Sequence, residues 1–138
     1  MIGILIVTHG DFGRELLKSA ELIVGKQEKV KTLSLKRGDN IESLYSSVNK
    51  DIGLLDDGEG VLVLTDLFGG SPSNVTAANM KETYFESLSG VNLPMLIEAL
   101  NTRVNEISLK ELTNKVYKVG IDGIKNIRCE LHITDDSI

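Results

Sequence analysis

The chain has few of the residues that several common kinds of functional site require. It has one cysteine, Cys129, and two histidines in 138 residues, which excludes an internal disulfide and gives too few ligands for a typical zinc site. It has no tryptophan, and aromatic residues make up 4%, so little is available to stack on a flavin ring. We therefore expect no metal and no cofactor, and a reducing compartment, the cytoplasm.

Long apolar runs and excess positive charge are also missing. No apolar run approaches the roughly 20 residues of a membrane span. The N-terminal run begins at Met1 without a basic segment or cleavage site, so we interpret it as a strand and not a signal peptide. The net charge of −5 argues against nucleic acid as the main partner, because nucleic-acid binding favours a basic surface. Length and composition predict a single domain over residues 1–138.

The most informative stretch runs from Val61 to Asn74. Val61–Leu64 is an unbroken β-favouring run, which predicts a strand covered on both faces, and Asp66 follows at its carboxyl end. Gly69-Gly70 permits positive φ or close approach to a ligand, Ser71 is the predicted N-cap, and Pro72 suits the first helical position. A carboxylate would then lie beside a helix N-terminus, where an anion can bind. Taken singly, each of these residues also fits an ordinary turn or helix start.

A second apolar strand, Met1–Val7, is followed by His9. Ligands of open α/β sheets bind at the carboxyl ends of strands, where strand order reverses, so we expect His9 and Asp66 to meet there. An imidazole that donates one ring N–H to a carboxylate keeps its other nitrogen as a base or nucleophile, and a helix N-terminus suits a phosphoryl group. A histidine after a strand is more often structural, so the hypothesis depends on the combined pattern.

The alternation of strands and helices predicts a doubly wound α/β fold with a mainly parallel sheet and helices on both faces. Periodicity predicts a helix from Phe12 to Val24, an edge strand over Lys29–Leu35, a helix capped by Asp39, a helix from Pro72 that carries Val75, Ala78 and Met80 inward, a short strand within Thr83–Leu88, and helices after Asn92 and Ser108.

The tail alternates apolar with polar residues over Ile127–Ile133, which predicts a C-terminal antiparallel edge strand. In such a strand His132 would face solvent and Cys129 would be a small buried residue.

Three segments resemble the enzyme IIA component (EIIA type-4) of the mannose/fructose/sorbose family of the bacterial sugar phosphotransferase system. They are Ile6-Val7-Thr8-His9-Gly10, Thr65–Asn74 and Gly90-Val91-Asn92-Leu93-Pro94-Met95-Leu96, and the resemblance extends to about Lys125. It implies that His9 is phosphorylated on Nε2 by the phosphocarrier HPr and passes the group to a histidine of the sugar-specific IIB. It also implies that Asp66 is the partner of this histidine, with Gly69, Gly70 and Ser71 as the phosphate cradle.

The resemblance further implies a homodimer in which the C-terminal strand is exchanged, and contact with the membrane only through the IIC/IID permease. The pair Asp11-Phe12 after His9-Gly10 departs from the family pattern, and the absence of a linker before Ile138 predicts IIB as a separate polypeptide. We expect an apolar docking patch at the crevice, formed by Phe12, Phe68, Leu22 and Ile23. Leu22 and Ile23 could equally be core residues.

Two other functions are compatible with such a fold. A receiver-like regulatory domain would be phosphorylated on Asp66, but strand one here ends in Thr-His without the acidic pair that binds magnesium, and no lysine stands at a matching strand end. A flavodoxin-like binding module would need the aromatic residues that this chain lacks.

Overall fold

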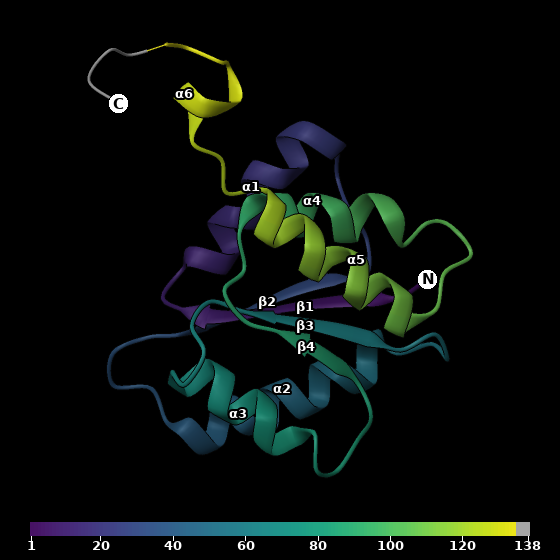
Figure 1. Ribbon diagram of the computed structural model, residues 1–138. Helices are drawn as coiled ribbons and strands as arrows, with labels where there is room; N and C mark the ends of the chain where they lie inside the picture. Colours follow the sequence, from purple (N-terminus) through teal and green to yellow (C-terminus); the bar gives the residue numbers. More distant parts are fainter. Residues whose placement is uncertain (135–138) are drawn as a thin grey trace.

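A four-stranded sheet with helices on both faces forms the centre of the computed structural model, which describes residues 1–134 (Figure 1). The strands are β1 (Gly3–His9), β2 (Val30–Leu35), β3 (Val61–Thr65) and β4 (Glu86–Leu88). The helices are α1 (Phe12–Val24), α2 (Ile41–Leu55), α3 (Ser71–Asn79), α4 (Leu93–Thr102), α5 (Leu109–Asp122) and α6 (Ile127–Glu130). All strand pairs are parallel, in the order β2-β1-β3-β4, so the predicted α/β class is confirmed.

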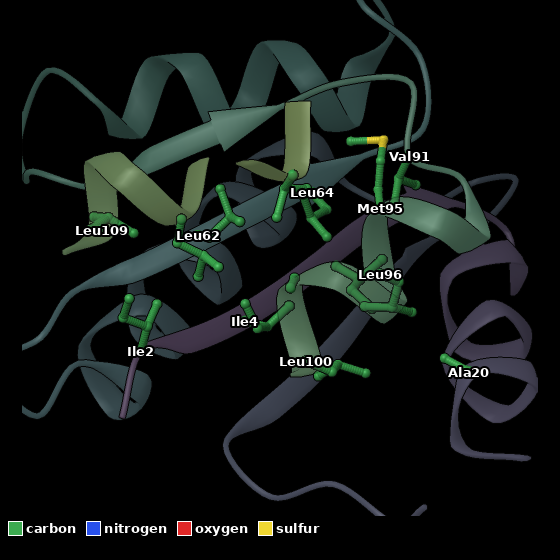
Figure 2. Close-up of a cluster of buried hydrophobic side chains, with 14 residues drawn as sticks. Ile2, Ile4, Ala20, Leu62, Leu64, Val91, Met95, Leu96, Leu100 and Leu109 are labelled. Carbon is green, nitrogen blue, oxygen red and sulfur yellow. The ribbon is translucent and has the colours of Figure 1, made fainter. Parts of the chain in front are cut away.

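Both central strands are apolar up to the polar residues at their carboxyl ends, because both of their faces are covered. Alternate residues of β1 point to opposite sides of the sheet, as the period of a strand requires. Ile4 and Ile6 belong to a cluster with residues of α1, α4 and α5, part of which Figure 2 shows. Leu5 and Val7 belong to a second cluster with residues of α2 and α3. A continuous hydrophobic run is therefore the pattern that this strand needs.

The order of the strands places β1 and β3 side by side at the point where the chain changes direction across the sheet. From β1 the chain crosses to β2 on one side, and it then returns to β3 on the other side of β1. Val7 pairs with Thr65, and His9 pairs with Leu35 of β2. The residues that follow β1 and β3 are therefore neighbours at the carboxyl edge, as the sequence predicted.

Three helix details differ from the predictions. Asn40, and not Asp39, is the N-cap of α2, because its Oδ1 accepts from the N–H of Glu42 at 2.7 Å, while Asp39 accepts from the N–H of Lys36. Gly70 is the N-cap of α3, so Ser71 is its first residue and makes no side-chain cap. Met80 lies beyond the last turn of α3 and is exposed.

The tail is the main correction to the predicted fold. Within residues 1–134 there is no antiparallel strand after α5. The segment instead forms the short helix α6, which stands away from the rest of the molecule in Figure 1, with Cys129 exposed. The alternation of apolar and polar residues wrongly predicted a strand here. The tail buries no residue against the sheet of its own chain, so its apolar side chains do not determine which secondary structure it forms.

Candidate functional site

His9 and Asp66 meet at the carboxyl edge of the sheet. The ring Nδ1 of His9 lies 2.9 Å from Oδ2 of Asp66, and the backbone N–H of His9 donates to the same oxygen at 3.0 Å. The imidazole is 48% exposed, whereas the Asp66 side chain is 15% exposed. Asp66 Oδ1 is buried without a partner among residues 1–134, so both hydrogen bonds that hold this carboxylate come from His9.

This contact decides which ring nitrogen is reactive. An ionised carboxylate only accepts hydrogen bonds, so in the neutral imidazole of His9 the proton lies on Nδ1 and the lone pair on Nε2. The carboxylate also stabilises the positive charge that develops on the ring when Nε2 forms a new bond. The half-exposed ring can be reached by a second protein. The predicted proximity of His9 and Asp66 is thus confirmed, and the geometry favours Nε2 of His9 as a nucleophile.

The turn that follows β1 holds the backbone of His9 in place. The buried Thr8 places its Oγ1 2.9 Å from the N–H of Gly13, an orphan donor in the first turn of α1. Gly10 has a φ of 53° and donates its N–H to the carbonyl of Leu35 at 2.8 Å. The side-chain cap from Thr8 therefore joins the end of β1 to the start of α1, a role that the sequence reasoning missed.

Gly70 lies against the reactive edge of the imidazole. A Cβ at this position would be 2.7 Å from Cε1 and 3.4 Å from Nε2 of His9. The φ of Gly70 is −76°, which any residue can adopt, so the site excludes a side chain here by contact with His9 and not by backbone strain. The preceding Gly69 has a φ of 87°, in the region that favours glycine.

The donors that remain free for an anion differ in part from the predicted cradle. The N–H of Gly70 donates to the carbonyl of Leu67 at 3.1 Å, so it closes the turn and is not available. The backbone N–H groups of Ser71 and Ser73, in the first turn of α3, have no acceptor among residues 1–134. Together with the Ser71 hydroxyl, they place unpaired donors and the positive end of a helix dipole beside Gly70. Such a terminus suits a phosphate.

The predicted docking residues separate into two places. Phe12 is the first residue of α1 and Phe68 follows Asp66 by two positions, and both are exposed at the edge that carries His9. Leu22 and Ile23 are exposed in the last turn of α1, about 15 Å along the helix axis from Phe12, so they do not line the crevice.

A cavity lies beside the site and shares Ser71 with it. It is a groove of about 570 Å³ between α2 and α3, which Ser71 and Asn74 line from the side of α3. Among residues 1–134, no three His, Cys, Asp or Glu side chains are grouped so that they could hold a metal ion. The groups with nucleophilic or anion-binding chemistry at this edge are the imidazole, the carboxylate and the start of α3.

Comparison with known proteins assigns the family. The sequence profile EIIA-man, described as PTS system fructose IIA component, matches residues 3–117. The chain belongs to the EIIA-man family. The mannose-specific EIIAB component of Escherichia coli (strain K12) is 37% identical over 130 residues, 94% of this chain and 40% of that protein. The chain thus spans about two fifths of that relative's length.

Two further relatives cover most of their own length. The fructose-specific EIIA component of Bacillus subtilis (strain 168) is 32% identical over 117 residues, which is 84% of this chain and 80% of that protein. The crystal structure of phosphotransferase system component EIIA from Streptococcus agalactiae matches this EIIA-man chain with a TM-score of 0.86 and 36% identity. That match covers 94% of this chain and 99% of the other. In the described part of the present chain, no helix has the length and apolarity needed to cross a membrane.

Proposed function

We propose that this EIIA-man chain is a phosphocarrier that accepts a phosphoryl group from HPr on Nε2 of His9 and passes it to a histidine of its IIB partner. The contact between Nδ1 of His9 and Asp66 Oδ2, at 2.9 Å, carries the proposal, because in the neutral ring it places the proton on Nδ1 and the lone pair on Nε2, and the ring is half-exposed.

Transfer needs no proton to move. The lone pair of Nε2 forms a bond to phosphorus while the bond from phosphorus to the donor imidazole breaks, and that electron pair stays on the donor nitrogen. The Nδ1 proton remains on His9, where Asp66 balances the positive charge of the ring. The N–H groups of Ser71 and Ser73 and the α3 dipole stabilise the phosphoryl oxygens, an effect of about 0.3–2 kcal/mol. The second transfer, to IIB, uses the same contacts in reverse.

The receiver-like alternative has less support. Oδ2 of Asp66 already accepts two hydrogen bonds from His9, and Oδ1 is buried, so neither oxygen is presented to a phosphoryl donor. An acyl phosphate on Asp66 would be sensitive to hydroxylamine, whereas a phosphohistidine is labile to acid, so the two chemistries are separable in one sample.

Incubation with phosphoenolpyruvate, enzyme I and HPr tests the proposal. We expect one acid-labile phosphate per chain, absent from His9→Ala and retained by His132→Ala, which removes the other histidine of the chain. Addition of IIB should discharge the label. A label that survives in His9→Ala would contradict the proposal. Asp66→Asn keeps a hydrogen-bond acceptor but removes the charge, and we expect transfer to slow by about 10²–10⁴-fold.

We further propose that the chain forms a homodimer in the cytoplasm, in contact with the membrane only through the IIC/IID permease. The outer edge of β4 pairs with no strand within residues 1–134, and a groove of about 320 Å³ runs beside it between α3 and Tyr117 of α5. The tail of the same chain exposes apolar side chains that a second copy could cover, namely Ile124, Ile127, Leu131 and Ile133. An open strand edge beside an apolar groove favours added strands.

Light scattering on the purified protein tests the dimer. The full chain should have twice the mass of a chain that ends at Gly123, because the truncated chain lacks the exchanged segment. Equal monomer masses for the two proteins would contradict the exchange.

A further inference from the structure

Asn74 connects the first turn of α3 to the glycine loop beside His9. Its side-chain Nδ2 donates to the carbonyl of Gly69 at 3.2 Å, and its backbone N–H donates to the carbonyl of Gly70 at 2.9 Å. Within residues 1–134, no other side chain forms a hydrogen bond to the backbone of residues 67–70. The side-chain amide is therefore the one polar side-chain group that fixes the orientation of this loop.

The direction of the hydrogen bond separates this role from helix capping. A capping side chain accepts hydrogen bonds from the free N–H groups of the first turn. Asn74 instead donates, and its acceptor is a carbonyl outside the helix. The bond leaves the N–H groups of Ser71 and Ser73 free for a ligand, and its acceptor belongs to the loop and not to α3.

The loop that Asn74 holds is the one that contacts the reactive ring. Gly69 has a φ of 87° and no side chain to restrict it. Gly70 approaches His9 so closely that a Cβ would be 2.7 Å from Cε1. If the Gly69 peptide changes orientation, the Gly70 backbone beside the imidazole and the N–H of Ser71 at the start of α3 therefore move with it. Small displacements of this kind reduce rates by up to about 100-fold in well-ordered sites.

We propose that Asn74 is a positioning residue for phosphoryl transfer: its side-chain amide holds the Gly69–Gly70 backbone against Nε2 of His9 and directs the first turn of α3 at the phosphoryl group. This inference rests on the proposed phosphocarrier function. Asn74 acts through the loop and has no contact with the reacting atoms, so it is separate from His9 and Asp66.

Two substitutions at this exposed position test the role, with one matched control. Asn74→Ala removes the donor, and Asn74→Asp also puts a negative charge near the phosphate, which favours the start of α3 but repels the ligand. Asn101→Asp makes the same chemical change on the exposed surface of α4. Single-turnover transfer from phosphorylated HPr should be about 10–100-fold slower in Asn74→Ala, slower still in Asn74→Asp, and unchanged in Asn101→Asp.

Two readouts distinguish positioning from other roles. The KM for HPr should stay within about twofold of the parent value, since a positioning residue affects the transition state and not docking. The NMR signals of the Gly69 and Gly70 amides and of the His9 ring nitrogens should shift in Asn74→Ala, whether or not the protein has been phosphorylated.

Several results would overturn the inference. Transfer at the parental rate in Asn74→Ala, with or without a lower melting temperature, would leave Asn74 a structural residue. A raised KM with an unchanged rate at saturating HPr would make it a docking residue. If the NMR signals of the Gly69 and Gly70 amides and of the His9 ring nitrogens did not change in Asn74→Ala, Asn74 would position neither the loop nor the ring. If the parent protein accepts no phosphate, the phosphocarrier function fails, and the NMR comparison still decides whether Asn74 positions the loop.

Discussion

A methyl group added at Gly70 tests the shape of the site directly. In Gly70→Ala the new Cβ would lie 2.7 Å from Cε1 of His9, whereas ordinary contacts begin at 3.4 Å, so the ring or the loop must move by about 0.7 Å. The same Cβ would lie 3.4 Å from Nε2, the atom proposed to bond to phosphorus. Rotation of the ring also weakens its hydrogen bond to Asp66, and such charge-assisted bonds contribute about 1.5–3 kcal/mol.

We expect Gly70→Ala to slow single-turnover transfer from phosphorylated HPr by about 100-fold or more. Its free energy of unfolding should fall by no more than about 1–3 kcal/mol, which is what the weakened bond to Asp66 contributes, because the φ of Gly70 is one that alanine adopts without strain. Quench-flow kinetics with radioactive phosphate measure the rate, and urea denaturation measures the stability.

Gly53→Ala is the matched control. Gly53 lies in α2, and a Cβ there would meet nothing within 4 Å, so the change should raise stability by up to about 1 kcal/mol and leave transfer unchanged. If Gly70→Ala transferred phosphate within twofold of the parent rate, the loop could not be packed against the reactive edge of the imidazole, and the reasoning would be refuted.

Three further predictions concern stability, each measured by urea denaturation. Gly13→Ala would place a Cβ 2.7 Å from Cγ2 of Ile6, so we expect a loss of about 1–3 kcal/mol, and a gain in stability would contradict the packing of α1 on β1. Arg103 is buried, which lowers the pKa of its guanidinium, and it donates to the carbonyls of Ile2 and Lys29. Arg103→Leu should lower the free energy of unfolding by about 2–4 kcal/mol, because it leaves these carbonyls without their donor. A loss below about 1 kcal/mol would show that the carbonyls find other partners. The Lys29 ammonium lowers the pKa of Asp57 from 3.8 to about 2, so the stability that this carboxylate adds is present above pH 3.8 and is lost as the pH falls through 2. The difference between the parent and Asp57→Asn should therefore be constant near neutrality, decline below pH 3.8 and vanish only below about pH 2, and a difference that grows on acidification would contradict the sign.

The central strands could be predicted because their environment leaves few alternatives. Val61–Leu64 has no polar residue to mark a solvent face, so only a strand buried on both sides accommodates it, and a parallel sheet then places Asp66 at the same edge as His9. The meeting of His9 and Asp66 follows from this topology, and sequence reasoning could reach it without coordinates.

Local choices between equivalent residues were less predictable. Asp39 and Asn40 are both good caps, but the Asp39 carboxylate accepts from the N–H of Lys36, and Asn40 accepts from the first turn of α2. Ser71 has the chemistry of a cap but is the first residue of the helix, since Gly70, whose N–H closes the turn by donating to the carbonyl of Leu67, occupies the N-cap position.

The sequence also contained signals that were not used. Asn74 follows the glycine pair by one helical turn, and Asn side chains commonly form hydrogen bonds to nearby backbone groups. Other side chains could not be placed from the sequence. Leu22, Ile23 and Ile127 are exposed because no other element covers them, and the periodicity of α1 and of the tail does not reveal such tertiary contacts.

The most direct test of the central claim is the position of the phosphorus atom on the phosphorylated protein. A sample with ¹⁵N-labelled histidine, phosphorylated through HPr, can be studied by NMR that correlates phosphorus with the ring nitrogens. We predict phosphorus bonded to Nε2 of His9, with the proton retained on Nδ1 beside Asp66. Phosphorus on Nδ1 of His9, on His132, or in a hydroxylamine-sensitive acyl phosphate on Asp66 would contradict the account.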